Sequence, residues 1–181
     1  MKTVINILDK KARREQIGVL KEIISVYQAL DEQGKLDGKM FDKYVEDMKE
    51  LAKLMRIDRS EGDTLFFMYE YFSEDRNPNN PQNLIPEGVT LADAPDFHNE
   101  LCSILNVVSN EELTARIGWG APRGHAKSAY LSNCFPVHEI CFEKRKYILI
   151  ISETESMSRK FIEWISNQLK FNEKLRADFG E

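Results

Sequence analysis

The prolines of this 181-residue chain are concentrated in one segment, and that concentration sets the outline of the fold. Four of the six prolines fall in residues 73–95, SEDRNPNNPQNLIPEGVTLADAP, together with several asparagines and a glycine. Proline lacks a backbone donor and fixes φ, so regular secondary structure is not expected to continue through such a segment. We therefore predict a Pro/Asn-rich linker at 73–95, between a helical N-terminal region at 1–72 and a second domain at 96–181.

The N-terminal region carries apolar residues at three- and four-residue steps, which is the spacing of amphipathic helices. One such set lies within residues 10–30, a second within 41–55, and an aromatic-rich piece, TLFFMYEYF, covers 64–72. The members of the two sets are Ile17, Leu20, Ile24, Tyr27 and Leu30, then Phe41, Val45, Met48, Leu51, Ala52 and Met55. The pattern predicts three helices whose apolar stripes belong to a core.

The segment after the linker changes character. DFHNELCSILNVV predicts a helix that begins at Asp96, and LTARIGW at 113–119 alternates apolar residues with others, as a strand does. KSAYLSNCF can then open a helix, although Pro136 must end or kink it.

A second predicted strand follows in KYILIISET, a short apolar run with β-branched residues, typical of a parallel strand that is covered on both faces. Ser152 and Glu155 are spaced as a capping box for the next helix. The order is strand, loop, helix, strand, helix. We therefore predict an α/β fold, with an N-terminal helical region followed by the first βαβ part of a P-loop, ASCE-like ATPase sheet.

Composition excludes several classes of protein. A formal net charge of −5 does not favour a general nucleic-acid binder, because such proteins neutralise phosphates with clustered basic residues. The apolar runs are far shorter than the ~20 residues that span a bilayer, and no export signal is evident, so we expect no membrane association. The three cysteines, Cys102, Cys134 and Cys141, lack metal-site spacing and are expected to be reduced or buried.

The chemistry of the second domain is concentrated in GWGAPRGHAKSAYLSN at 118–133. A phosphate-binding loop directs backbone N–H groups at phosphates, while a Lys and a Ser or Thr contact the phosphates and Mg²⁺. Lys127 and Ser128 suit these roles, but the common pattern requires glycine where Ala121 and Ala126 stand. Gly124 supplies one permissive position. On the residues alone, a nucleotide site and a basic surface turn both remain open.

APRGHAKSAYLSNCFP resembles the altered Walker A segment of the large terminase subunits of tailed bacteriophages. The resemblance continues in FHNELCSIL before the loop, in KYILIISETESMSRKFIEWI after it, and in NEKLRADFGE at the end. It covers about residues 95–181, and residues 1–94 carry no motif of that family.

The resemblance implies an ATPase that drives viral DNA into a capsid, with ATP and Mg²⁺ as cofactors. Lys127 would bind the β- and γ-phosphates, Ser128 would ligate Mg²⁺, and Arg123 would act as a γ-phosphate sensor or an arginine finger in cis. The implied catalytic residues are Arg123 and Lys127, and the implied nucleotide-binding residues are Ala121, Pro122, Arg123, Gly124, His125, Ala126, Lys127, Ser128 and Ala129.

Two of these assignments, Arg123 and His125, have plainer alternatives, and two further histidines lie outside the set. Arg123 could form a surface salt bridge, and His125 could serve loop geometry only. His98 and His138 are isolated in the sequence and are expected to be structural or exposed. His98 could neighbour an adenine pocket if its helix packs beside the loop.

No Walker B strand, coupling motif or nuclease domain is visible, so we expect an N-terminal fragment of such a motor that hydrolyses ATP poorly or not at all alone. The implied partners are double-stranded DNA, the portal protein, the small terminase subunit and further copies of the chain, in the host cytoplasm. Two other functions remain open. One is a non-catalytic module whose residues 1–72 bind the portal or small subunit, and the other is a helicase-like or defence ATPase.

Overall fold

The structure, a computed structural model, describes residues 6–111 and 115–180. The chain forms two compact units, Met1–Arg59 and Ser60–Glu181, and each is described by itself. Helix α2 begins in the first unit and ends with its last three residues in the second.

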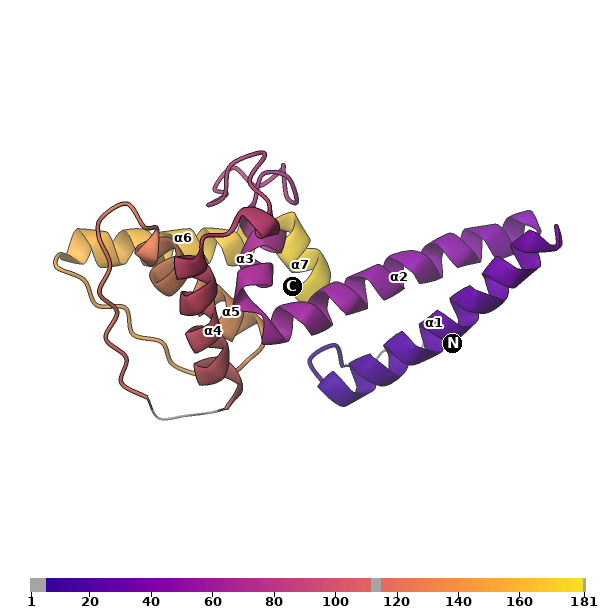
Figure 1. Cartoon of the computed structure of the whole chain (residues 1–181), viewed down its shortest axis with the longest axis horizontal. Helices are drawn as coiled ribbons and strands as arrows, with labels where there is room; N and C mark the ends of the chain where they lie inside the picture. Colours follow the sequence, from indigo (N-terminus) through magenta and orange to yellow (C-terminus); the bar gives the residue numbers. More distant parts are fainter. Residues whose placement is uncertain (1–5, 112–114, 181) are drawn as a thin grey trace. The chain divides into compact units, whose positions relative to one another are not determined.

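The first unit is a helical hairpin made by α1 (Lys10–Glu32) and α2 (Gly38–Gly62), which lie side by side (Figure 1). Asp9 caps α1, because its carboxylate accepts hydrogen bonds from the amides of Lys11 and Ala12. Arg13 is completely buried and donates to Asp58 of α2 over 3.1 Å. The first two predicted helices are confirmed.

Within residues 60–111 and 115–180, the second unit packs five α-helices and two shorter turns. The helices are α3 (Thr64–Phe72), α4 (Asp96–Asn110), α5 (Phe135–Cys141), α6 (Glu155–Phe171) and α7 (Glu173–Phe179), and the turns are a 3-10 helix, η1 (Leu91–Asp93), and a π-helix, η2 (Ala129–Cys134). Helix α3 is buried along most of its length and packs against α4 and α5. Its Phe67 ring makes edge contacts with His138 and Phe179, so α3 shares one aromatic core with α5 and α7. The helices predicted from Thr64 and from Asp96 are confirmed.

The proline-rich segment is irregular but well packed. Amide side chains connect it to the C-terminal helices: Asn77 donates to Asn172 over 2.8 Å, and Asn80 donates to Gln168 over 2.9 Å. The indole N–H of Trp164 donates to the carbonyl of Gln82. These bonds satisfy buried polar groups that an irregular segment would otherwise leave without partners.

The predicted α/β fold is wrong, because the described residues contain helices and no strand. The described parts of the two segments expected to form the βαβ sheet, 115–119 and 146–154, are drawn as plain coil in Figure 1, and the single bridge in the described part joins Ser73 to Ile85. Positions 113 and 114 of the first predicted strand lie outside the described residues. The apolar run at 147–151 is extended, but a sheet also requires a neighbouring backbone in register, and no backbone hydrogen bond connects the two described segments.

Two local expectations also change. The helix after the loop continues past Pro136: the π-helix η2 leads into α5, and Pro136 lies in the first turn of α5, where a missing N–H is tolerated. The cap of α6 is Thr154 instead of Ser152, since the Thr154 hydroxyl accepts the Met157 amide over 3.4 Å.

All three cysteines are buried and unpaired with one another, as predicted. Burial raises the pKa of the Cys102 thiol to about 12, which leaves it protonated at neutral pH. None of the helices in the described ranges has the length and apolar character needed to cross a membrane.

Candidate functional site

The loop ahead of η2 adopts a backbone that glycine would normally provide. Gly124 has φ +87° and Ala126 has φ +51°, so two positions in three are left-handed. For a residue with a side chain, this conformation costs about 1–2 kcal/mol. The alanine in the position where the common phosphate-loop pattern has glycine therefore takes the glycine-like conformation. Strain of this kind is found most often at functional sites.

Lys127 closes the loop on itself. Its ammonium group donates to the carbonyl oxygens of Ala121 and Pro122 over 2.7 and 2.6 Å. The helix begins at this residue, and its first intrahelical donors are the amides of Ala129 and Tyr130, both directed to the Ala126 carbonyl. The amides of Lys127 and Ser128 precede these bonds and are the unsatisfied donors expected at a helix start.

The remaining predicted site residues lie in the same loop, around the hydrogen bonds of Lys127. Arg123, Gly124, His125 and Ser128 are exposed, and Ala129 is half-buried. Among the described residues, no ion pair holds the Arg123 guanidinium and no hydrogen bond holds the Ser128 hydroxyl. The structure thus brings Ala121, Pro122 and Lys127 together and leaves the arginine and the serine at the surface of the loop.

An aromatic cluster fastens the loop to α4. The ring of His98 lies against Tyr130 with centroids 4.4 Å apart, and Phe97 contacts the rings of Trp119 and His125. His98 Nε2 lies 3.2 Å from the His125 carbonyl, an acceptor, so Nε2 carries the proton and Nδ1 accepts the hydroxyl of Tyr130. The helix that carries His98 therefore does pack beside the loop. His125 contributes its carbonyl and ring to loop geometry.

The chemistry of the loop fits a phosphate better than a metal held by protein alone. Lys127 and Arg123 supply positive charge, and the first amides of the helix supply donors. Ser128 offers one hydroxyl oxygen, and within the described ranges no three His, Cys, Asp or Glu side chains are grouped to hold a metal. A magnesium ion here would need oxygens from a phosphate ligand.

A buried polar cluster in α5, formed by His138 and Glu139, was not identified from the sequence. His138 and Glu139 are almost fully buried, and the carboxylate accepts bonds from His138 Nδ1 over 3.1 Å and from the Ser109 hydroxyl over 2.6 Å. His138 Nε2 lies 2.9 Å from the Ser60 carbonyl. Each ring nitrogen of His138 therefore lies within hydrogen-bonding distance of an oxygen atom.

The carboxylate of this pair stays ionised. Burial by itself would raise the pKa of Glu139, but the hydrogen bonds from His138 and Ser109 outweigh it, and the pKa lies below its usual value. The expectation that His138 is structural is correct. The adjacent His-Glu pair was the available signal, but its partners Ser60 and Ser109 are far away in sequence.

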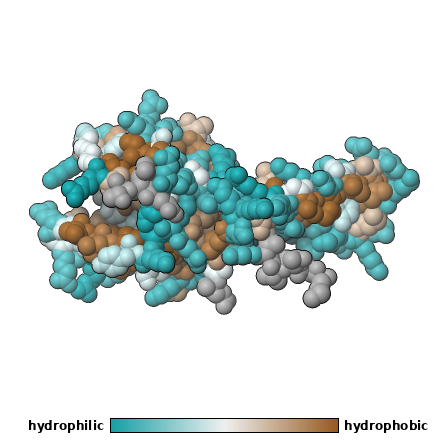
Figure 2. Space-filling view, turned by 90° about the horizontal axis from the view of Figure 1, so that it is seen from below, coloured by the Kyte–Doolittle hydropathy of each residue, from teal (hydrophilic) through white to brown (hydrophobic). Residues whose placement is uncertain are grey.

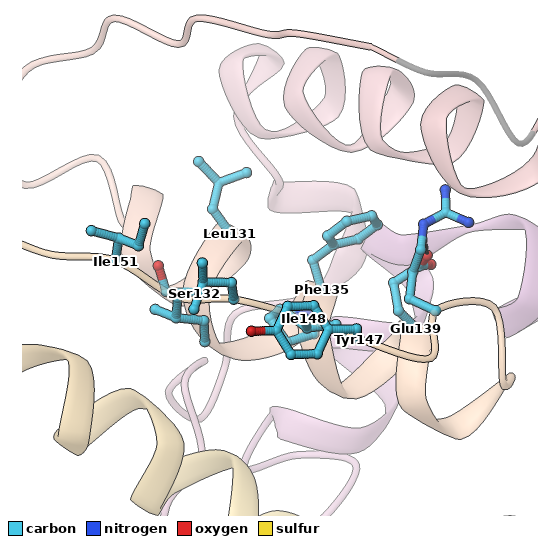
Figure 3. Close-up of a pocket in the computed structure, with 11 residues that line it drawn as sticks. Leu131, Ser132, Phe135, Glu139, Tyr147, Ile148 and Ile151 are labelled. Carbon is cyan, nitrogen blue, oxygen red and sulfur yellow. Dashed lines mark ion pairs between the residues drawn. The ribbon is translucent and has the colours of Figure 1, made fainter.

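A hollow lies between α5 and the segment 146–151 (Figure 3). Its volume is about 360 Å³, and apolar side chains make up most of its lining, with the buried Glu139 and Arg145 at one end. In Figure 3, Leu131, Ser132 and Phe135 come from the helical segment, and Tyr147, Ile148 and Ile151 come from the segment 146–151.

Comparison of the chain with protein-family models, with curated proteins and with solved structures found no match.

Proposed function

We propose that residues 121–128 bind the phosphates of Mg-ATP and that the chain is the nucleotide-binding portion of a DNA-packaging large terminase subunit. The observation that supports this most is the left-handed Ala126 directly before Lys127 and the helix start. In a surface turn without a ligand, a left-handed alanine would cost stability and serve no purpose. In a phosphate-binding loop, this position requires a left-handed residue. The proposal depends on the loop and the helix, and no sheet is part of it.

In this proposal each loop residue has a distinct task. Lys127 exchanges its two carbonyl partners for phosphate oxygens, because a hydrogen bond between two charged groups is stronger than one to a neutral carbonyl. The exposed Arg123 neutralises the terminal phosphate, and Ser128 offers its hydroxyl to the Mg²⁺ that accompanies the nucleotide. The backbone at Gly124 and His125 follows the phosphate chain.

Calorimetric titration with a non-hydrolysable Mg-ATP analogue tests the proposal. Lys127→Ala is expected to weaken binding by about 10-fold or more, since one hydrogen bond to a charged group contributes about 1.5–3 kcal/mol. Lys160→Ala removes an exposed lysine of α6 and serves as the matched control, with unchanged affinity. Equal affinity of the Lys127→Ala protein and the parent chain would refute the phosphate site.

Two substitutions at one position separate loop conformation from charge. Ala126→Gly is expected to retain binding, because glycine adopts φ +51° without strain. Ala126→Val is expected to lose it, since a β-branched residue rarely adopts this conformation. If both variants bind equally, the left-handed geometry has no role in recognition.

A second candidate function is a non-catalytic module that binds the portal protein or the small terminase subunit. The observation in its favour is an exposed apolar stripe on α2, where Phe41, Met48 and Met55 recur every seven residues and are each more than two-fifths exposed. A stripe of this spacing suits a helix-in-groove contact. The module would bind its partner equally well with and without nucleotide, so a nucleotide requirement in a pull-down experiment would exclude it.

A further inference from the structure

The extended segment 147–151, YILII, exposes apolar side chains to an unusual degree. Tyr147, Leu149 and Ile151 are 80%, 65% and 82% exposed. Within the described part of the chain, no backbone N–H or C=O of this segment forms a hydrogen bond to another backbone group. Exposed apolar residues on an unpaired, extended backbone form a template for pairing with another strand. Figure 2 shows apolar residues open at the surface of the second unit.

The segment is held in place from one side. The alternate residues Ile148 and Ile150 are half-buried and line the cavity with Leu131 and Phe135 (Figure 3). Exposure alternates along the segment with the period of two of a surface strand, and the more exposed Tyr147, Leu149 and Ile151 border the same hollow. The segment therefore has the geometry of a strand without its neighbour.

Charge on either side of the segment indicates what the neighbour is. Basic residues, Lys144, Arg145 and Lys146, come directly before it, and Glu153 and Glu155 follow it. A basic, then apolar, then acidic stretch complements a second copy of itself only in the antiparallel direction.

One register places every apolar side chain of 147–151 opposite another apolar side chain. When Leu149 faces Leu149 of the second copy, Tyr147 faces Ile151 and Ile148 faces Ile150, so each apolar residue opposes another apolar residue. Arg145 then lies opposite Glu153. A shift by two residues in either direction places an apolar residue opposite a serine, a glutamate or a lysine. Shifts by one residue would reverse the faces.

We infer that two copies of this chain associate through antiparallel pairing of residues 147–151 about a two-fold axis at Leu149. The contact is isologous, because the same segment serves both copies. Its small size makes it a weak, concentration-dependent dimer. This association involves neither the loop at 121–128 nor nucleotide, and it stands or fails independently of the proposed function.

Sedimentation velocity over a range from low to several hundred micromolar chain tests the inference. The parent is expected to shift from monomer to dimer as concentration rises. Leu149→Lys and Leu149→Glu should each remain monomeric, because like charges would meet across the axis. An equimolar mixture of the two variants should dimerise again, since lysine then faces glutamate. Met48→Lys, an exposed apolar position of the other unit, is the matched control and should dimerise as the parent does.

Oxidative cross-linking tests the register. Leu149→Cys should form a disulfide-linked dimer, because the Cα atoms of facing residues lie about 4.5–5.5 Å apart, within the range of a disulfide. Tyr147→Cys alone should not, since two copies of position 147 would be about 13 Å apart along the strands. The native cysteines are buried and do not compete.

Three results would overturn the inference. They are a parent chain that stays monomeric throughout, a dimer that survives Leu149→Lys, and a Tyr147→Cys protein that cross-links as efficiently as Leu149→Cys. Circular dichroism of each variant confirms folding, which exposed substitutions at position 149 should preserve.

Discussion

Removal of the Glu139 carboxylate should destabilise the second unit severely. The ionised carboxylate accepts hydrogen bonds from His138 and from Ser109, and a bond to a charged group contributes about 1.5–3 kcal/mol. Two such bonds give about 3–6 kcal/mol, and the usual cost of breaking a buried ion pair by removing one partner, about 3–5 kcal/mol, lies within that range. Glu139→Ala should therefore lower the free energy of unfolding by about that amount.

Urea denaturation followed by tryptophan fluorescence measures this loss. Trp119 and Trp164 are the two tryptophans of the chain and both belong to the second unit, so the signal reports on that unit. Glu163→Ala removes an exposed carboxylate from α6 and should change the free energy of unfolding by less than about 0.5 kcal/mol. A Glu139→Ala protein within about 1 kcal/mol of the parent would refute the assigned role of the buried pair.

The same pair predicts the direction of a pH effect. Because the pKa of Glu139 is lowered in the folded chain, its stabilisation is complete above the unfolded pKa of about 4.3 and is lost as pH falls through the folded pKa. Glu139→Gln has no such carboxylate. The difference in unfolding free energy between parent and Glu139→Gln should therefore narrow below about pH 4. A difference that stays constant down to pH 2 would contradict the lowered pKa.

Two further substitutions test the packing of each unit. Asp58→Asn should destabilise the hairpin by about 1–3 kcal/mol, because Arg13 is buried and would lose its charged acceptor; thermal melting followed by circular dichroism checks it, and an unchanged melting curve would contradict it. Asn172→Ala should cost the second unit about 2 kcal/mol, since this side chain caps α7 and also accepts a bond from Asn77; urea denaturation checks it, and a loss below 0.5 kcal/mol would show that the cap is dispensable.

Helical parts of the fold could be predicted because their signal is local. The apolar spacing from Ile17 to Leu30 is complete within one element, and the structure places a helix there. The segment YILII was predicted to be a parallel strand covered on both faces, and this was wrong: it forms no strand, and Tyr147, Leu149 and Ile151 are exposed. Its neighbours in a sheet could not be inferred, because strand pairing depends on residues remote in the chain. An apparent strand–helix–strand order in the sequence is therefore weaker evidence for a sheet than a helical spacing of apolar residues is for a helix.

The residues of the candidate site could be chosen from the sequence, but the contacts that hold them in place could not. Lys127 and Ser128 were identifiable from their order in the loop, but the carbonyl partners of Lys127 depend on how the loop turns at Gly124 and Ala126. The sequence indicated that His98 would lie near the loop only if its helix packed beside the loop, and it gave no means to decide whether the helix does so. The adjacent His138 was the only local signal for Glu139, and it was not sufficient, because a buried carboxylate is recognised by its partners and Ser109 is remote in the chain.

The central claim is that the backbone from Gly124 to Ser128 receives a phosphate chain. Two-dimensional ¹⁵N–¹H NMR during titration with Mg-ATP observes these amides one by one. The account predicts that the largest, saturable shifts occur at Gly124, His125, Lys127 and Ser128, and that they vanish in Lys127→Ala. Shifts confined to other parts of the chain, or no shifts at millimolar nucleotide, would contradict it.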